Sequence, residues 1–241
     1  PTASSAAACA ASTASKSAAE ESRPLGRVIL QPVAASIFRY VALGDSTGVG
    51  VGSGNDGGYP ERLYQRLKRA GVKAGIMNLS LSGATSADLL AGPLHKAVEV
   101  RPALVTLGIG SNDLWRMVPV SGFALNLNHI ADRLASTGAH VVVSNLIDLT
   151  RAPVASMIEW LQVPTAVLAA RIIDFNRQIA ELAKRPNFTV VDLFSVSARM
   201  GPELAQLFGA DGFHPSATGY EQWADVLWPH VERLGRAWSP D

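Results

Sequence analysis

Short apolar runs alternate with longer amphipathic stretches along the chain from residue 37 onward. The runs are rich in Val, Ile and Leu without strict alternation of polar and apolar positions. This pattern is typical of parallel strands that are buried on both faces. We therefore predict five strands, at residues 37–44, 74–80, 103–110, 140–146 and 188–194.

The stretches between these runs predict helices. In the first of them, Pro60 lies near the start, Leu63 and Leu67 are one helical turn apart, and Gly71 follows the end. Pro93 predicts a bend within the second helix. The predicted helices span residues 59–70, 85–100, 122–138, 165–185 and 216–234.

This alternation of strands and helices predicts an α/β fold, with a five-stranded parallel sheet in a three-layer α/β/α arrangement. In such a sheet the binding crevice lies beyond the carboxyl ends of the strands. Ser46, Gly83 and Asn112 follow the first, second and third predicted strands, respectively. They are therefore candidates for one shared site.

The N-terminal segment differs from the rest of the chain. Residues 1–23 are rich in Ala and Ser and carry no aromatic residue, so we predict a flexible tail there and a single domain over residues 24–241. The chain begins at Pro1, and we expect processing to have removed a preceding segment. Cys9 follows three alanines, as bacterial lipid-attachment cysteines do, but its polar surroundings favour an inert thiol. The segment favours export, to the periplasm or outside the cell, over a cytoplasmic location.

Composition narrows the classes of function. With 48% hydrophobic and 17% charged residues and a net charge of +1, the chain lacks the basic surface expected of a nucleic-acid-binding protein. No apolar run approaches the roughly 18 residues that predict a membrane span. Cys9 is the single cysteine, which excludes an internal disulfide and a cysteine-based zinc site. We expect neither a metal nor an organic cofactor, and the sequence does not predict an oligomeric state.

The glycine-rich stretch that begins with "GDSTGVG", residues 44–50, fits two unrelated motifs. Its G-x-S-x-G pattern is typical of a turn that exposes a nucleophilic serine, Ser46. The later glycines match G-x-G-x-x-G from Gly52 to Gly57, but they lie well past the strand, and "AGIMNLSLSG", the neighbourhood of the second strand, has no acidic residue. We therefore interpret residues 50–58 as a mobile rim beside the serine rather than a phosphate-binding loop.

A nucleophilic serine needs a base and a group that orients the base. Of the five histidines, His214 lies in a turn-rich loop just before the last predicted helix, with Asp211 three residues earlier. The carboxylate of Asp211 can fold back to one ring nitrogen and leave the other for Ser46. Acyl transfer also needs donors for the developing oxyanion. The N–H of Gly83 and the side-chain amide of Asn112 are candidates.

At these residues the sequence resembles the SGNH hydrolases, also called GDSL esterases and lipases. "GDST" matches the serine block with Thr47 in place of the usual leucine, "GSND" matches the asparagine block, and "DGFHP" matches the acid–histidine block. The resemblance covers about residues 39–220. It implies a flavodoxin-like fold, a triad of Ser46, Asp211 and His214, and an oxyanion hole of Ser46, Gly83 and Asn112.

The resemblance implies a serine ester hydrolase that forms an acyl-enzyme intermediate on a small-molecule ester. We favour short- to medium-chain carboxylic esters; the alternatives are an acyl thioesterase or lysophospholipase, or a carbohydrate acetylesterase. An α/β-hydrolase is disfavoured because its serine follows several strands. A non-catalytic binding protein is disfavoured because the triad is intact. Candidates for the substrate pocket are Trp115, Met117, Met157, Ile158, Trp160 and Leu161.

Overall fold

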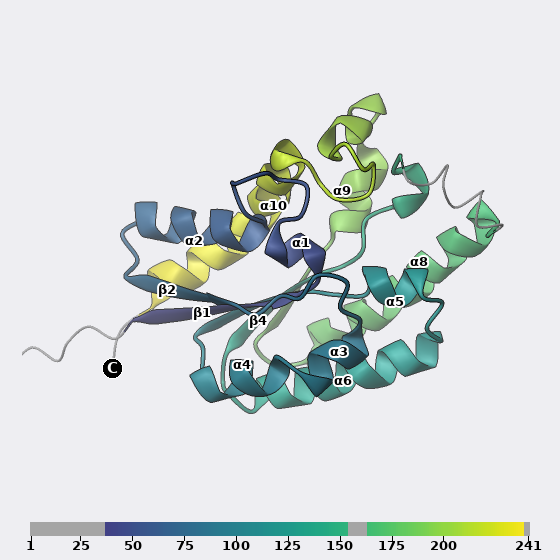
Figure 1. Ribbon diagram of the computed structural model, residues 1–241. Coiled ribbons are helices and arrows are strands. Elements are labelled where there is room, and N and C mark those ends of the chain that lie inside the picture. The colour runs from purple at the N-terminus through teal and green to yellow at the C-terminus, as the bar shows by residue number, and fades with distance from the viewer. Residues whose placement is uncertain (1–36, 154–162, 239–241) are drawn as a thin grey trace, which may run out of the picture. The chain divides into compact units, whose positions relative to one another are not determined.

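A computed structural model of the protein describes residues 37–153 and 163–238 (Figure 1). Its parallel sheet has the strand order β2-β1-β3-β4-β5. This confirms the predicted α/β architecture and its flavodoxin-like order. The strands are β1 (Phe38–Gly44), β2 (Ala74–Asn78), β3 (Leu104–Gly108), β4 (His140–Ser144) and β5 (Phe188–Val191). The predicted tail boundary near residue 23 lies outside the described residues.

Helices connect successive strands. The longer ones are α2 (Tyr59–Arg69), α6 (Val120–Ala135), α8 (Thr165–Glu181) and α10 (Ala217–Ala237), and they match predicted helices. The predicted helix over residues 85–100 is two helices, α3 (Ser86–Ala91) and α4 (Leu94–Val100), which are interrupted at Gly92 and Pro93. Proline there has no N–H to continue the helix, which explains the break.

Several short elements were not predicted. They are the α-helices α1 (Ser46–Val49), α5 (Ser111–Trp115) and α9 (Leu193–Arg199) and the 3₁₀ helices η1 (Leu149–Arg151), η2 (Leu182–Lys184) and η3 (Pro202–Leu207). One or two turns contain too few residues to show a helical period. The predicted fifth strand, at 188–194, accordingly included the start of α9.

The side chains of β1 alternate between two apolar layers. Tyr40 and Ala42 pack with residues of α2 and α10, whereas Val41 and Leu43 pack with residues of α3, α4, α6 and α8. Figure 1 shows α2 and α10 on one face of the sheet and α3, α4 and α6 on the other. Both faces of the sheet are therefore covered, and its carboxyl edge is left for the site. Across the described ranges, no helix combines the length and apolar character needed to cross a bilayer.

Candidate active site

Ser46 is the first residue of α1, directly after β1. The side chain of Asp45 caps this helix by accepting hydrogen bonds from the N–H of Thr47 (2.9 Å) and from its hydroxyl (2.7 Å). Asp45 is only 1% exposed. Burial raises its pKa, while the hydrogen bonds from Thr47 and the nearby His214 oppose that increase. The threonine that replaces the usual leucine thus supplies a hydroxyl partner to a buried carboxyl group.

Side chains from two distant parts of the sequence meet at Ser46. Nε2 of His214 lies 2.9 Å from Oγ of Ser46, and Nδ1 of His214 lies 2.6 Å from Oδ2 of Asp211. An ionised carboxylate only accepts hydrogen bonds, so Nδ1 carries the ring hydrogen and Nε2 presents its lone pair to the serine. The structure therefore brings the predicted serine, histidine and aspartate together in hydrogen-bonded order.

The loop that carries His214 also fixes Asp211. Oδ1 of Asp211 accepts the backbone N–H groups of Phe213 and His214, both at 2.9 Å. Partial desolvation raises the pKa of Asp211, but the His214 side chain and these two N–H groups outweigh it and lower the pKa below its usual value. Asp211 therefore stays ionised while it holds the imidazole ring.

Gly83 lies on the loop before α3 and Asn112 lies in α5, and the two segments are joined directly. Nδ2 of Asn112 donates to the carbonyl of Ala84 at 3.0 Å, and the guanidinium of Arg116 donates to the carbonyl of Gly83 at 2.9 Å. Gly83 has φ = +78°, a conformation that favours glycine. The N–H of Ser46, at the first position of α1, has no partner inside that helix. These groups are the donors predicted for an oxyanion hole.

A buried carboxyl group, Asp113 of α5, connects α5 to the start of α3, and the sequence did not single it out. Asp113 is 0% exposed. Its oxygens accept the N–H of Ser86 at 2.8 Å and the hydroxyl of Ser86 at 2.5 Å, and Asn126 donates to that hydroxyl at 3.0 Å. Desolvation raises the pKa of Asp113, against the hydrogen bonds from Ser86. Its only sequence signal is its position directly after Asn112.

A pocket adjoins the Ser46 side chain at the carboxyl edge of the sheet. Its lining comes from the segments that follow β1, β3 and β4, from the loop of Phe213 and His214, and from Trp223 of α10. Trp115 and Met117, two predicted pocket residues, are not part of this lining. Trp115 packs behind Phe213, with ring centroids 5.7 Å apart, and Met117 is 49% exposed. The other four candidates, Met157, Ile158, Trp160 and Leu161, lie outside the described residues.

The glycines after Ser46 have a packing role beside the histidine loop. A Cβ atom at Gly52 would lie 2.7 Å from the carbonyl oxygen of Pro215 and 3.1 Å from Cβ of His214. The hydroxyl of Tyr220 also donates to the carbonyl of Val51 at 2.8 Å. The rim of the site is therefore packed closely against the loop that carries His214.

No cluster of three or more His, Cys, Asp or Glu residues suited to a metal ion occurs within residues 37–153 and 163–238. The chemistry available at the site is that of its serine, imidazole, carboxylate and amide groups. These are the groups that acyl transfer needs.

The family model of GDSL-like lipases and acylhydrolases matches residues 42–222, which include all of these groups. The chain belongs to this family. It is 25% identical to the esterase TesA of Pseudomonas aeruginosa, over 86% of this chain and 94% of that protein. It is 30% identical to a GDSL-like esterase of Mycobacterium tuberculosis, over 76% of this chain and 58% of that longer protein.

Solved structures agree with this assignment. A crystal structure of TesA matches with a TM-score of 0.66 at 25% identity and covers 81% of this chain and 99% of its own. The lipase/acylhydrolase of Enterococcus faecalis has the same fold, with a TM-score of 0.66 at 22% identity over 84% of this chain and 98% of its own. The chain is thus a hydrolase of the GDSL family.

Proposed function

We propose that the protein hydrolyses short- to medium-chain carboxylic esters through an acyl-enzyme intermediate on Ser46. The observation that carries this proposal is the continuous hydrogen-bonded path from Oγ of Ser46 through His214 to Asp211. A serine hydroxyl is a weak nucleophile until a base accepts its proton, and a base is effective only when it is held in the right tautomer. Both conditions are met in this arrangement.

In the first step, Oγ of Ser46 forms a bond to the acyl carbon while its proton passes to Nε2 of His214. The carbonyl electron pair moves onto the oxygen and gives a tetrahedral oxyanion. When the carbonyl re-forms, the bond to the alcohol oxygen breaks, and the imidazolium returns the proton to that oxygen. Asp211 keeps the ring oriented and stabilises its positive charge in the interval.

In the second step, a water molecule takes the place of the alcohol beside His214. It loses a proton to Nε2 as its oxygen attacks the acyl carbon. When the carbonyl re-forms, the bond to Oγ of Ser46 breaks, the imidazolium returns the proton to Oγ, and the free acid leaves. In both steps the oxyanion would receive hydrogen bonds from the N–H of Ser46, the N–H of Gly83 and the second amide hydrogen of Asn112. Removal of one such donor typically lowers kcat about 10²–10³-fold.

Two observations bear on the substrate class. The curated relatives are named as esterases, which favours oxygen esters over thioesters. Isoleucine and leucine side chains and the ring of Trp223 line the pocket beside Ser46, which favours an alkyl acyl group over a sugar. An acyl-CoA, a lysophospholipid and an acetylated sugar are therefore the comparison substrates.

The test is the Ser46→Ala variant, assayed with nitrophenyl butanoate and with a phosphonate that labels reactive serines. We expect Ser46→Ala to lose nearly all turnover and all labelling, while Ser136→Ala, an exposed serine at the end of α6, keeps both. Hydrolysis by Ser46→Ala at the wild-type rate would refute the scheme. Absence of labelling in the wild type would favour a binding protein instead.

A further inference from the structure

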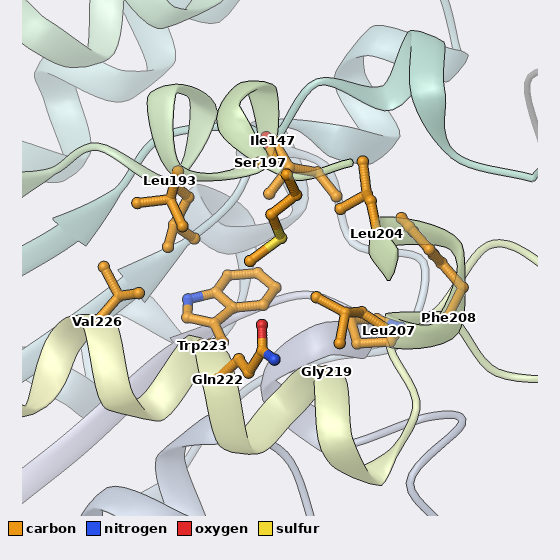
Figure 2. A pocket seen from close by; sticks show the side chains of 13 residues that line it. Ile147, Leu193, Ser197, Leu204, Leu207, Phe208, Gly219, Gln222, Trp223 and Val226 are labelled. Atoms are coloured by element: carbon orange, nitrogen blue, oxygen red, sulfur yellow. The ribbon is translucent and has the colours of Figure 1, made fainter. Parts of the chain in front are cut away.

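A second cavity of about 70 Å³ lies between α9, η3 and α10 (Figure 2). Its walls are mainly apolar and include Leu193, Leu204, Leu207, Phe208 and Val226. Apart from the indole of Trp223, the polar side chains of the lining are those of Ser197 and Gln222. The hydroxyl of Ser197 is already engaged, since it donates to the carbonyl of Phe194 and accepts the N–H of Asp148. The cavity therefore suits an apolar ligand.

This cavity adjoins the catalytic pocket. Ile147, Pro215 and Trp223 line both spaces. Ile147 follows β4, Pro215 directly follows His214, and Trp223 projects from α10. The indole ring of Trp223 is held in place by stacking on Tyr59, with centroids 4.8 Å apart and an interplanar angle of 11°. These three residues are therefore where the polar site at Ser46 and the apolar space adjoin.

We propose that this cavity takes the end of the alkyl chain of the acyl group bonded to Ser46, and so sets the acyl-chain preference. The inference rests on the proposed function and adds the residues that select the substrate. An acyl chain that leaves the carbonyl carbon would pass Ile147 and Trp223 and end among Leu204, Leu207 and Val226.

The acyl side suits this cavity better than the alcohol side. The acyl group remains bonded to Ser46 through both steps, so an apolar cavity can hold it throughout. The alcohol has to leave after the first step, and water has to replace it at Nε2 of His214. An apolar cavity on the alcohol side would favour the alcohol over that water.

The size of the cavity sets a limit on chain length. A cavity of about 150 Å³ lined by Leu, Ile and Phe accommodates a benzene molecule, and the present one is about half as large. It therefore has room for a few methylene groups. Each methylene moved from water into an apolar site improves binding about fourfold. We expect kcat/KM to rise about fourfold per methylene until the cavity is full and then to stop rising.

The experiment measures kcat/KM for nitrophenyl esters from acetyl to dodecanoyl in the wild type and in Val226→Phe, whose larger ring fills the cavity. We expect the acetyl ester, which is too short to reach the cavity, to be hydrolysed within about twofold of the wild-type rate. For hexanoyl and octanoyl esters we expect a loss of about tenfold or more, equal to about two methylene contributions. Leu204→Phe fills the same space from η3 and should give the same profile.

Three comparisons make the result specific. Val226→Ala enlarges the cavity and should move the optimum to longer chains. Ile37→Phe, on an exposed residue just before β1 at the opposite end of the sheet, should leave the profile unchanged. A series of alkyl acetates varies the alcohol at a constant acyl group. An unchanged acyl profile in folded Val226→Phe and Leu204→Phe, or a change confined to the alkyl acetates, would overturn the proposal.

A binding measurement separates this inference from the proposed function. Octanoate that enters the cavity contacts Trp223, so the tryptophan fluorescence of the wild type should change on titration with octanoate, and that of Val226→Phe should not. If Ser46→Ala retains activity but the titration behaves as expected, the reaction scheme fails and the cavity assignment stands. If esters are hydrolysed through Ser46 but octanoate gives the same response in both proteins, only the cavity assignment fails.

Discussion

Asp211 and Asp113 each hold one part of the site, but they do so in opposite surroundings. The side chain of Asp211 is 47% exposed, and its carboxylate accepts hydrogen bonds from its own loop and from the catalytic imidazole. Asp113 is 0% exposed and binds Ser86, the first residue of the helix that follows Gly83. The pKa of Asp211 is lowered and that of Asp113 is raised.

The difference shows two ways in which a carboxylate can serve a catalytic site. Asp211 contacts the imidazole ring of His214. In the proposed mechanism that ring becomes charged, so an ionised Asp211 would stabilise the transition state directly. Asp113 contacts neither Ser46 nor His214 among the described hydrogen bonds. We therefore expect any effect of Asp113 on catalysis to pass through the placement of Ser86, Gly83 and Asn112, as that of a positioning residue does.

The largest expected effect follows from Asp211→Asn. The amide keeps nearly the same shape but no longer fixes the Nδ1–H tautomer of His214, so we expect kcat to fall about 10⁴-fold. The thermal unfolding midpoint should change little, because the side chain lies near solvent. Steady-state kinetics with nitrophenyl butanoate and thermal unfolding check both parts. A kcat within tenfold of the wild type would remove Asp211 from the mechanism.

A smaller effect on rate and a larger one on stability are expected for Asp113→Asn. The amide cannot accept from both the N–H and the hydroxyl of Ser86, and an unsatisfied buried group costs about 1–3 kcal/mol. We expect kcat to fall about tenfold with little change in KM, because the oxyanion donors shift.

Asp88→Asn, in the first turn of α3, is the matched control for Asp113→Asn. Asp88 is exposed and accepts the N–H and the hydroxyl of Thr85 at the start of α3. Its loss should cost less than about 1 kcal/mol. Urea unfolding together with kinetics compares the two variants. Equal losses of stability in both would show that the burial of Asp113 has no special role.

The smallest expected effect is on the pH dependence of the free energy of unfolding, which should differ between the two aspartates. The folded-state pKa of Asp211 is lowered, so its stabilisation is complete above the unfolded pKa of about 3.9 and is lost as pH falls through the folded value. The folded-state pKa of Asp113 is raised, so its contribution is most favourable below about 3.9 and declines as pH rises through the folded value. Urea unfolding from about pH 3 to pH 7 gives the free energy of unfolding of the wild type and of each Asn variant. The difference between wild type and variant should change with pH in opposite directions for Asp211→Asn and Asp113→Asn. Changes in the same direction would contradict the comparison.

The sequence predicts the sheet and the longer helices well because their apolar periodicity extends over many residues. It also identifies Ser46, Asp211 and His214, since a serine turn and an acid–histidine loop can be recognised locally. The roles of these residues in catalysis stay predictions until variants are assayed, although the structure brings them together at hydrogen-bond distance.

The contribution of Asp113 and the second cavity could not be predicted in this way. The contact between Asp113 and Ser86 joins positions 27 apart, and no local pattern indicates that the carboxyl group turns inward. The cavity is lined by α9, η3 and α10, of which the first two are too short to leave a periodic signal. Both features depend on tertiary packing.

The contact between Ser46 and His214 also has a consequence for the growing chain. It joins residues 168 positions apart, whereas Asp211 and His214 are only three apart. During synthesis the nucleophile and both oxyanion loops leave the ribosome well before the base does. On the proposed mechanism, Ser46 therefore lacks its base in an unfinished chain, and we expect hydrolytic activity only after the loop of His214 packs against the segment of Ser46.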